Sequence, residues 1–171
     1  EIGPLVVGCV CVPEEAIDLL VEAGVKDSKD LSKKKRESIR TWFFENCHTR
    51  GWKYSIISCQ PSRIDLAVEN NGLNILETQL FAEAINKLAL DDNNDGFMIT
   101  NDACDVDENR FTRRISALID QWPWPNSNMV SFHKADENYP IVGMASILAK
   151  QHRDYCIAEI ENKIGFPIGS G

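Results

Sequence analysis

The sequence predicts an α/β domain, in which a sheet is flanked by helices. Three observations lead to this fold class. Short apolar runs rich in β-branched residues have the length of strands, longer stretches have the apolar spacing of helices, and the two kinds of segment alternate along the chain. Such alternation is typical of α/β proteins. The 171 residues contain no internal repeat and no low-complexity linker, so we expect a single domain.

Four segments are expected to be strands. Residues 5–12 form a continuous apolar run, which favours a strand that is buried on both faces. The other candidates are shorter: residues 52–59, 97–100 and 129–132. The third strand leads into Asn101 and Asp102, and the fourth leads into His133.

Five segments are expected to be helices: residues 14–23, 33–47, 74–90, 108–122 and 140–165. Most of them begin with a residue that favours a helix start. Ser32 and Asp107 can act as N-caps, and Asn74 and Glu77 have the spacing of a capping box. Pro140 suits the first position of the last helix.

The charge distribution leaves two interpretations open. A net charge of −8 argues mildly against a nucleic-acid binder, because such proteins must neutralise phosphates. However, residues 26–40 carry a local surplus of four positive charges, from Lys26, Lys29, Lys33, Lys34, Lys35, Arg36 and Arg40 against Asp27, Asp30 and Glu37. This segment could face a phosphate backbone, or it could be a solvated helix face.

Nothing in the sequence indicates export or a membrane. No apolar run approaches the ~18 residues that a membrane span needs, and the first residues do not resemble a signal peptide. The six cysteines form no CxxC pair, and several lie in apolar runs, which predicts reduced, structural thiols. Zinc is not expected. We expect a cytoplasmic protein that is a monomer and has no membrane partner.

Asp102 and Asp136 share one situation, because each follows a short apolar strand and precedes a helix. Open α/β sheets place their chemistry just beyond the strand ends. If the two strands are neighbours, both carboxylates point into one crevice, and Mg²⁺ or Mn²⁺ would relieve their repulsion. Such a site suits phosphoryl transfer by two metal ions. The structural alternative is that both aspartates are ordinary helix caps.

Several stretches resemble ribonuclease HII, of the archaeal type, in their order and spacing, and together they span nearly the whole chain. They are Gly3-Pro4-Leu5-Val6-Val7, Val25-Lys26-Asp27-Ser28-Lys29-Asp30-Leu31-Ser32, Asn101-Asp102-Ala103-Cys104-Asp105-Val106-Asp107-Glu108-Asn109-Arg110-Phe111, His133-Lys134-Ala135-Asp136, Tyr139-Pro140-Ile141-Val142, Ala145-Ser146-Ile147-Leu148-Ala149-Lys150 with Arg153-Asp154, and Ile168-Gly169-Ser170-Gly171.

The resemblance implies a ribonuclease H-like fold, with a central mixed sheet flanked by helices and four carboxylates that bind metal. Asp102 and Asp136 match two of the four, with Mg²⁺ or Mn²⁺ as the cofactor. The implied reaction is two-metal-ion hydrolysis of the RNA strand in an RNA–DNA hybrid duplex, and at single ribonucleotides in duplex DNA. Such enzymes take part in DNA replication and repair.

Further roles follow from the resemblance. Ser28 and Lys29 are expected to bind the substrate backbone, and Ser146 and Lys150, four residues apart on one helix face, could join that contact. His133 is expected to pack or hydrogen-bond near the metal site without binding it. Three other carboxylates are expected to be caps or surface charges: Asp105, Asp107 and Asp154.

The chain departs from the family at both ends. The first strand, with an Asp-Glu-Ala-Gly-Arg-Gly segment that carries the other two carboxylates, is expected immediately before Glu1, and a Tyr-Pro-Ser-Asp continuation is expected after Gly171. We therefore expect residues 1–171 to be a catalytic domain that is incomplete at both termini and inactive by itself. The catalytic glutamate is not assigned to Glu1.

Two other functions remain open at this stage. A non-catalytic nucleic-acid-binding relic would follow if the upstream carboxylates had been lost. A calcium-binding EF-hand loop is suggested by Asp91, Asn93, Asp95, Gly96 and Asp102, although position 12 of such a loop should be a glutamate and no second loop is present to pair with it.

Overall fold

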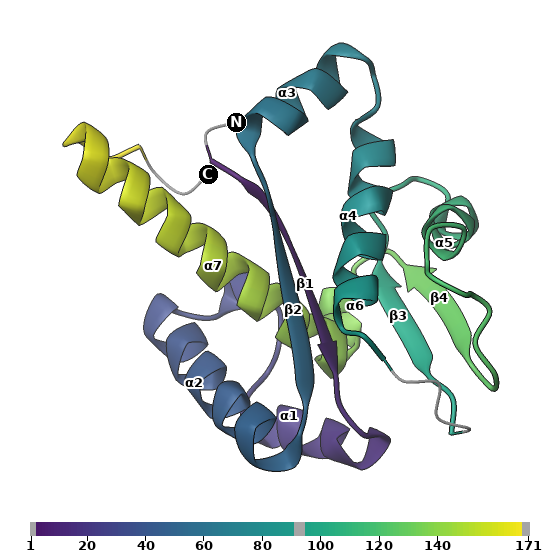
Figure 1. The fold of residues 1–171 in the computed structure, drawn as a ribbon. Helices are drawn as coiled ribbons and strands as arrows, with labels where there is room; N and C mark the ends of the chain where they lie inside the picture. Colours follow the sequence, from purple (N-terminus) through teal and green to yellow (C-terminus); the bar gives the residue numbers. More distant parts are fainter. Residues whose placement is uncertain (1–2, 91–94, 169–171) are drawn as a thin grey trace.

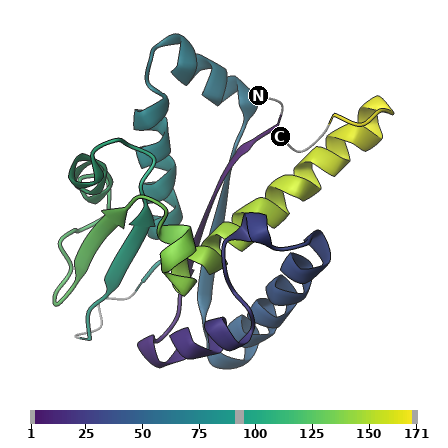
Figure 2. The same ribbon diagram turned by 180° about the vertical axis from the view of Figure 1, so that it is seen from behind.

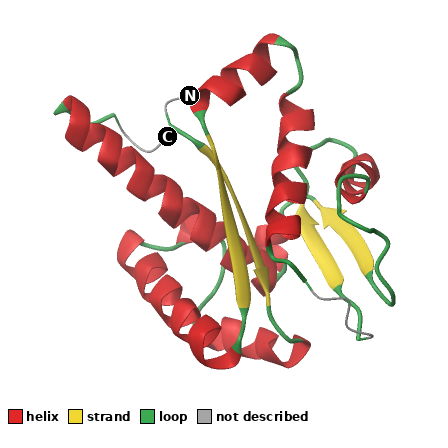
Figure 3. Cartoon of the chain, in the orientation of Figure 1, coloured by secondary structure: helices red, strands yellow, loops and turns green. Residues whose placement is uncertain are grey.

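A computed structural model describes residues 3–90 and 95–168. It contains the four expected strands, β1 (Leu5–Cys11), β2 (Lys53–Cys59), β3 (Met98–Asp102) and β4 (Asn128–Phe132) (Figures 1 and 3). Each bound coincides with the predicted one or differs from it by at most two residues. The predicted α/β fold class is therefore confirmed for the described part of the chain.

The strands form two hydrogen-bonded pairs. β1 pairs antiparallel with β2, Leu5 opposite Cys59, and β3 pairs in parallel with β4, Asp102 opposite Phe132. Among the described residues no ladder joins β1 to β3, and side chains of both strands line a cavity between them. The expected single sheet is thus split at this cavity.

The helices surround both strand pairs. In chain order they are η1 (Glu14–Ala16), α1 (Ile17–Glu22), η2 (Ser28–Asp30), α2 (Lys33–Arg50), α3 (Pro61–Glu69), α4 (Leu73–Lys87), α5 (Glu108–Ser116), α6 (Ala135–Asn138) and α7 (Pro140–Ile164), with η for a 3₁₀ turn. Two predicted caps are confirmed, because Ser32 Oγ accepts from Lys35 N at 3.2 Å and Asp107 Oδ1 accepts from Arg110 N at 2.9 Å.

Three helix predictions are wrong in detail. The N-cap of α4 is Gly72, without a side-chain hydrogen bond, so Asn74 and Glu77 form no capping box. Helix α3 was not expected, because none of its side chains is fully buried and only Ile64 and Ala67 pack against the core. Helix α5 ends at Ser116, and the following residues form tight turns, with Leu118 N bonded to the carbonyl of Ile115.

The two faces of the β1–β2 pair are covered by different helices. Val7 and Cys9 face α4, where Leu80 and Ala84 complete an apolar cluster. Gly8 and Val10 face the other side, where Gly8 lies against the α7 backbone at Ala145 and Val10 packs on the core of α1, α2 and α7. Figure 2 shows from behind that α1, α2 and α7 lie together on one side of β1, and that β3, β4 and α5 lie on the other. No described helix is long and apolar enough for a membrane span.

Candidate metal centre

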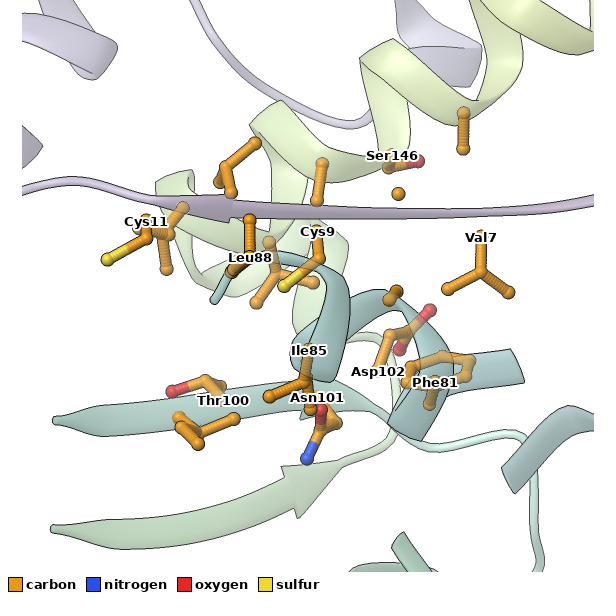
Figure 4. Close-up of a pocket in the computed structure, with 18 of the residues that line it drawn as sticks. Val7, Cys9, Cys11, Phe81, Ile85, Leu88, Thr100, Asn101, Asp102 and Ser146 are labelled. Carbon is orange, nitrogen blue, oxygen red and sulfur yellow. The ribbon is translucent and has the colours of Figure 1, made fainter. Parts of the chain in front are cut away.

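The cavity between β1 and β3 has a volume of about 650 Å³. Consecutive residues of both strands line it, rather than alternate ones, so the free backbone edges of β1 and β3 face the cavity. Phe81 and Ile85 of α4, with Leu88 directly after this helix, lie below β1 in the close-up view, and Ser146 of α7 lies above (Figure 4). Most of the lining is apolar.

Two carboxylates lie at one end of this cavity. Asp102 is the last residue of β3, and its Oδ1 accepts a hydrogen bond from Ala135 N at 2.9 Å. Asp136 follows in α6 and is 8% exposed. The predicted convergence of these two residues agrees with the structure, because both line the same cavity. Neither aspartate is the N-cap of the helix that follows it: the N-caps of α5, α6 and α7 are Asp107, Lys134 and Tyr139.

The surroundings of Asp102 oppose its negative charge. Burial raises the pKa of the Asp102 carboxyl, and the nearby charge of Asp136 raises it further. The hydrogen bond from Ala135 N and the charges of Lys29 and His133 act in the opposite direction on this pKa. The net effect is a raised pKa, so a bound cation would stabilise the ionised carboxylate.

The donor set suits a hard divalent cation but provides only part of a site. Carboxylate oxygens are the ligands that Mg²⁺ and Mn²⁺ prefer. Within residues 3–90 and 95–168, no group of three or more His, Cys, Asp or Glu side chains is placed to hold a metal ion. Asp102 and Asp136 would therefore need ligands from elsewhere, or water, to complete the coordination.

The expected substrate-binding residues lie on two neighbouring elements. Ser28 Oγ and Ser146 Oγ are 3.0 Å apart, which joins η2 to α7, and either hydroxyl could donate. Ser28 is 3% exposed, so its hydroxyl is committed mainly to this contact. Lys29, the next residue in η2, is exposed, and its charge lowers the pKa of Asp102. Lys150 Nζ lies 3.0 Å from Asp154 Oδ1, one turn further along α7.

Asp154 and Asp105 are not the surface charges that the sequence analysis expected. The Asp154 side chain is 10% exposed and accepts from Arg36 Nη2 at 3.0 Å, while Arg36 Nη1 donates to the carbonyls of Ser28 and Leu31. This network holds η2 against α7. Of the seven basic residues in this segment, Arg36 is thus a packing residue, whereas the five lysines are exposed.

Asp105 is fully buried and bound to Arg110. Its side chain is 0% exposed, and Arg110 Nε donates to Oδ2 at 2.8 Å. Hydrogen bonds from Arg110 first, and then from Asp107 N, hold the pKa of Asp105 well below its usual range. The predicted cap role is confirmed for Asp107 alone.

Glu77 is a cavity residue that the sequence analysis took for a helix cap. It lines the same cavity as Asp102, and burial raises the pKa of its carboxyl, with a further rise from the charge of Asp105. A signal was present in the sequence: Glu77 lies four residues before Phe81, on the α4 face that continues to Ala84 and Leu88. This face looks into the cavity.

The structure contradicts the EF-hand alternative. An EF-hand would require Asp102 to open a helix after the loop, but Asp102 ends strand β3 and is paired with Phe132. Asp91 and Asn93 of that pattern lie outside the described residues, as do Glu1 and the Gly169-Ser170-Gly171 ending.

Comparison with known proteins identifies relatives along the whole chain. The family profile described as Ribonuclease HII matches residues 1–171. Ribonuclease HII from Methanocella arvoryzae is 39% identical over 171 residues, which cover 99% of this chain and 70% of the relative. The enzyme from Methanococcus maripaludis is 38% identical, with 99% and 66% covered. The chain thus spans about two thirds of these curated relatives.

Solved structures show the same fold. RNase HII from Archaeoglobus fulgidus, in a complex with PCNA, has a TM-score of 0.74 and 30% identity, with 95% of this chain and 70% of that chain covered. Ribonuclease H2 from Pyrococcus horikoshii also has a TM-score of 0.74 and 30% identity, with 98% and 77% covered. Together with the sequence matches, these similarities show that the chain belongs to the ribonuclease HII family.

Proposed function

We propose that the protein containing this chain hydrolyses the RNA strand of RNA–DNA hybrids and cuts at single ribonucleotides in duplex DNA. The observation that supports this most directly is the meeting of Asp102 and Asp136 at one end of the cavity, in a chain of the ribonuclease HII family. Only a 2′-hydroxyl separates RNA from DNA at the point of cleavage, so the active protein must detect that group.

Asp102 and Asp136 are proposed to hold Mg²⁺ or Mn²⁺. Bound ions of this kind activate a water and stabilise the leaving oxygen of a phosphodiester. The described residues fix the positions of the two carboxylates. The hydrogen bond from Ala135 N orients Asp102, and Asp136 is held by its place in α6. The raised pKa of Asp102 supports a role that is completed by a cation.

The substrate contact is proposed to come from η2 and α7. Lys29 is exposed, its charge lowers the pKa of Asp102, and it is proposed to contact a backbone phosphate near the cut. Ser28 and Ser146 fix the relative position of the two elements through their mutual contact. Lys150 is 26% exposed and can reach the same backbone while it stays paired with Asp154.

A strand from the same polypeptide, outside the described residues, is proposed to fill the cavity and bring further carboxylates. The two free strand edges support an extended occupant, and the greater length of the relatives supports its presence in the parent protein. In Figure 4, β1 and β3 run in opposite directions, and Asp102 lies toward the start of β1. A strand joined to the start of β1 by a short turn would therefore run parallel to β3 and end beside Asp102.

The test is cleavage of a duplex with one ribonucleotide by the full-length protein. With Mg²⁺ or Mn²⁺, the wild type should cut at the ribonucleotide and leave 5′-phosphate and 3′-hydroxyl ends. Asp102→Asn should reduce the rate at least ~100-fold, since it removes a ligand charge at nearly constant shape. The matched control is Asp65→Asn, an exposed aspartate of α3. Near-normal cleavage by Asp102→Asn would reject the assignment, and duplex binding without cleavage by the wild type would favour the relic.

The cellular compartment and the oligomeric state of the protein are also proposals. All six cysteines are free thiols, which suits a reducing compartment such as the cytoplasm. A monomer is proposed, and light scattering of the full-length protein would check its mass in solution.

A further inference from the structure

His133 connects the two loops that carry the candidate metal ligands. It follows β4, and its main-chain N donates to Glu108 Oε1 at 2.6 Å. The ring makes two further contacts: Nδ1 lies 3.1 Å from Glu108 Oε1, and Nε2 lies 2.8 Å from the carbonyl oxygen of Asp105. Asp105 and Glu108 both belong to the segment after Asp102, so His133 joins the loop after β4 to the loop after β3.

The contact partners of His133 are themselves fixed. Asp105 is anchored by Arg110 on one carboxylate oxygen and by Arg110 and Asp107 N on the other. Arg114 lies 3.4 Å from the same carboxylate. The carbonyl of Asp105 therefore belongs to a turn that several hydrogen bonds hold, and the His133 ring contacts this turn.

The turn that leads from His133 to Asp136 needs support at both ends. Lys134 has a φ of 56°, in the left-handed region that side chains disfavour. Ala135 N donates to Asp102 Oδ1 and holds the far end of the turn, while the His133 contacts hold the near end. Loss of the near end would let Asp136 shift relative to Asp102.

We propose that His133 and Glu108 are positioning residues, which set the separation of Asp102 and Asp136 before a metal ion binds. The proposal rests on the proposed metal-dependent function of this site. It assigns no metal contact to His133, whose ring nitrogens are engaged with Glu108 and Asp105. Its role is to keep the two ligands preorganised, so that binding of the ion need not order the loops.

The experiment measures metal binding directly in the full-length protein. Free Mn²⁺ is followed by electron paramagnetic resonance during a titration of wild type and His133→Ala, and the Mg²⁺ dependence of cleavage is recorded beside it. We expect Mn²⁺ affinity to fall about 10- to 100-fold, the usual effect of losing a residue that orients a metal ligand. The melting temperature should change little, because the His133 side chain is 50% exposed. His48→Ala, an exposed histidine of α2, is the matched control.

Conservative and double variants test the geometry. In His133→Gln the terminal amide can reach the position of Nε2 and donate to the Asp105 carbonyl, so most of the affinity should return. His133→Ala combined with Glu108→Ala should be no weaker than the worse single variant, because both act through one contact set. The Mg²⁺ concentration for half-maximal rate should rise in each weakened variant, while the rate at saturating Mg²⁺ largely recovers.

Failure of the positioning role can be distinguished from failure of the proposed function. If Asp102→Asn abolishes Mn²⁺ binding but His133→Ala leaves it unchanged, the positioning role is overturned and the metal site stands. An equal loss in affinity and melting temperature, with no rescue by His133→Gln, would also overturn it, because that pattern indicates general destabilisation. If Asp102→Asn itself binds Mn²⁺ and cleaves normally, the proposed function falls.

Discussion

Asp102 combines two opposing requirements at a single residue. It is held in place by the N–H of Ala135, which favours the ionised carboxylate, and it is buried beside Asp136, which disfavours it. Burial is the larger effect, so the folded-state pKa lies above the ordinary value. Without a metal ion, the buried charge of Asp102 destabilises the folded protein, and a bound cation would remove this cost.

This balance predicts the pH dependence of stability. Since the folded-state pKa of Asp102 is raised, the folded protein holds a proton that the unfolded chain releases, and stability falls as the pH rises through that window. At pH 7 without metal, Asp102→Asn should therefore melt at a higher temperature than the wild type. The difference should vanish below about pH 3.9, where both states of the wild type are protonated.

Calorimetry at several pH values, with Asp65→Asn as the control, measures this difference. Excess Mn²⁺ should reverse the order, since a ligand of the folded state stabilises only the protein that binds it. A variant that melts below the wild type at pH 7 without metal would contradict the raised pKa.

The sequence predicts residue roles where the information is local. Asp102 and Asp136 could be selected because each follows a strand, and Asp107 could be identified as a cap from its place before a helix. The burial of Asp154 could not be predicted, because its partner Arg36 is 118 residues away in the chain. Asp105 has a partner only five residues away, but its burial depends on the packing of the whole loop.

Elements were predictable in proportion to the apolar face that they bury. Strand β1 and helix α7 carry strong patterns, and both were predicted within one residue of their bounds. Helix α3 buries no residue completely, and only Ile64 and Ala67 pack against the core, so its apolar signal in the sequence is weak. The Asn74–Glu77 spacing was misleading because Gly72 begins α4 two residues earlier.

The contact between β1 and α7 predicts a sensitive position. A Cβ atom at Gly8 would lie 2.4 Å from the carbonyl oxygen of Ala145, a backbone atom that cannot rotate away. Gly8→Ala should therefore push α7 from β1 and lower the free energy of unfolding by about 1–3 kcal/mol, the usual range for overpacking. Chemical denaturation measures the change.

Gly72→Ala is a suitable comparison for Gly8→Ala. There the nearest atom to an added Cβ, the carbonyl oxygen of Ala67, lies at 3.6 Å, an ordinary contact distance. A smaller loss of stability is expected at Gly72 than at Gly8. Equal losses at the two positions would show that steric contact with α7 is not the cause.

At the scale of the whole molecule, the division of the strands into two pairs is the main feature that the sequence did not predict in detail. Strand runs indicate where strands lie, but the register and the neighbours depend on every strand of the sheet. Here the free edges of β1 and β3 face one cavity. The first strand that the resemblance implies before β1 stays a prediction, and the cavity between the free edges is the position proposed for it.

Hydrogen exchange can test whether a strand occupies this place. In residues 1–171 alone, alternate amides of β1 bond to β2 while the others point toward the cavity, as in any antiparallel edge strand. Protection from exchange should thus alternate along residues 5–11 in this fragment and become uniform in the full-length protein. Alternation that persists in the full-length protein would show that the β1 edge stays unpaired.

The candidate metal ligands and the candidate substrate-binding residues lie on different elements. Asp102 ends β3 and Asp136 follows β4, whereas Ser28, Lys29, Ser146 and Lys150 belong to η2 and α7. Helix α7 packs against β1, and η2 packs against α7. On the proposed assignment, the carboxylates and the residues that contact the duplex therefore belong to different elements. Changes on the η2–α7 side should then act mainly on KM, and changes around the aspartates mainly on kcat and metal affinity, so recognition and turnover could evolve separately.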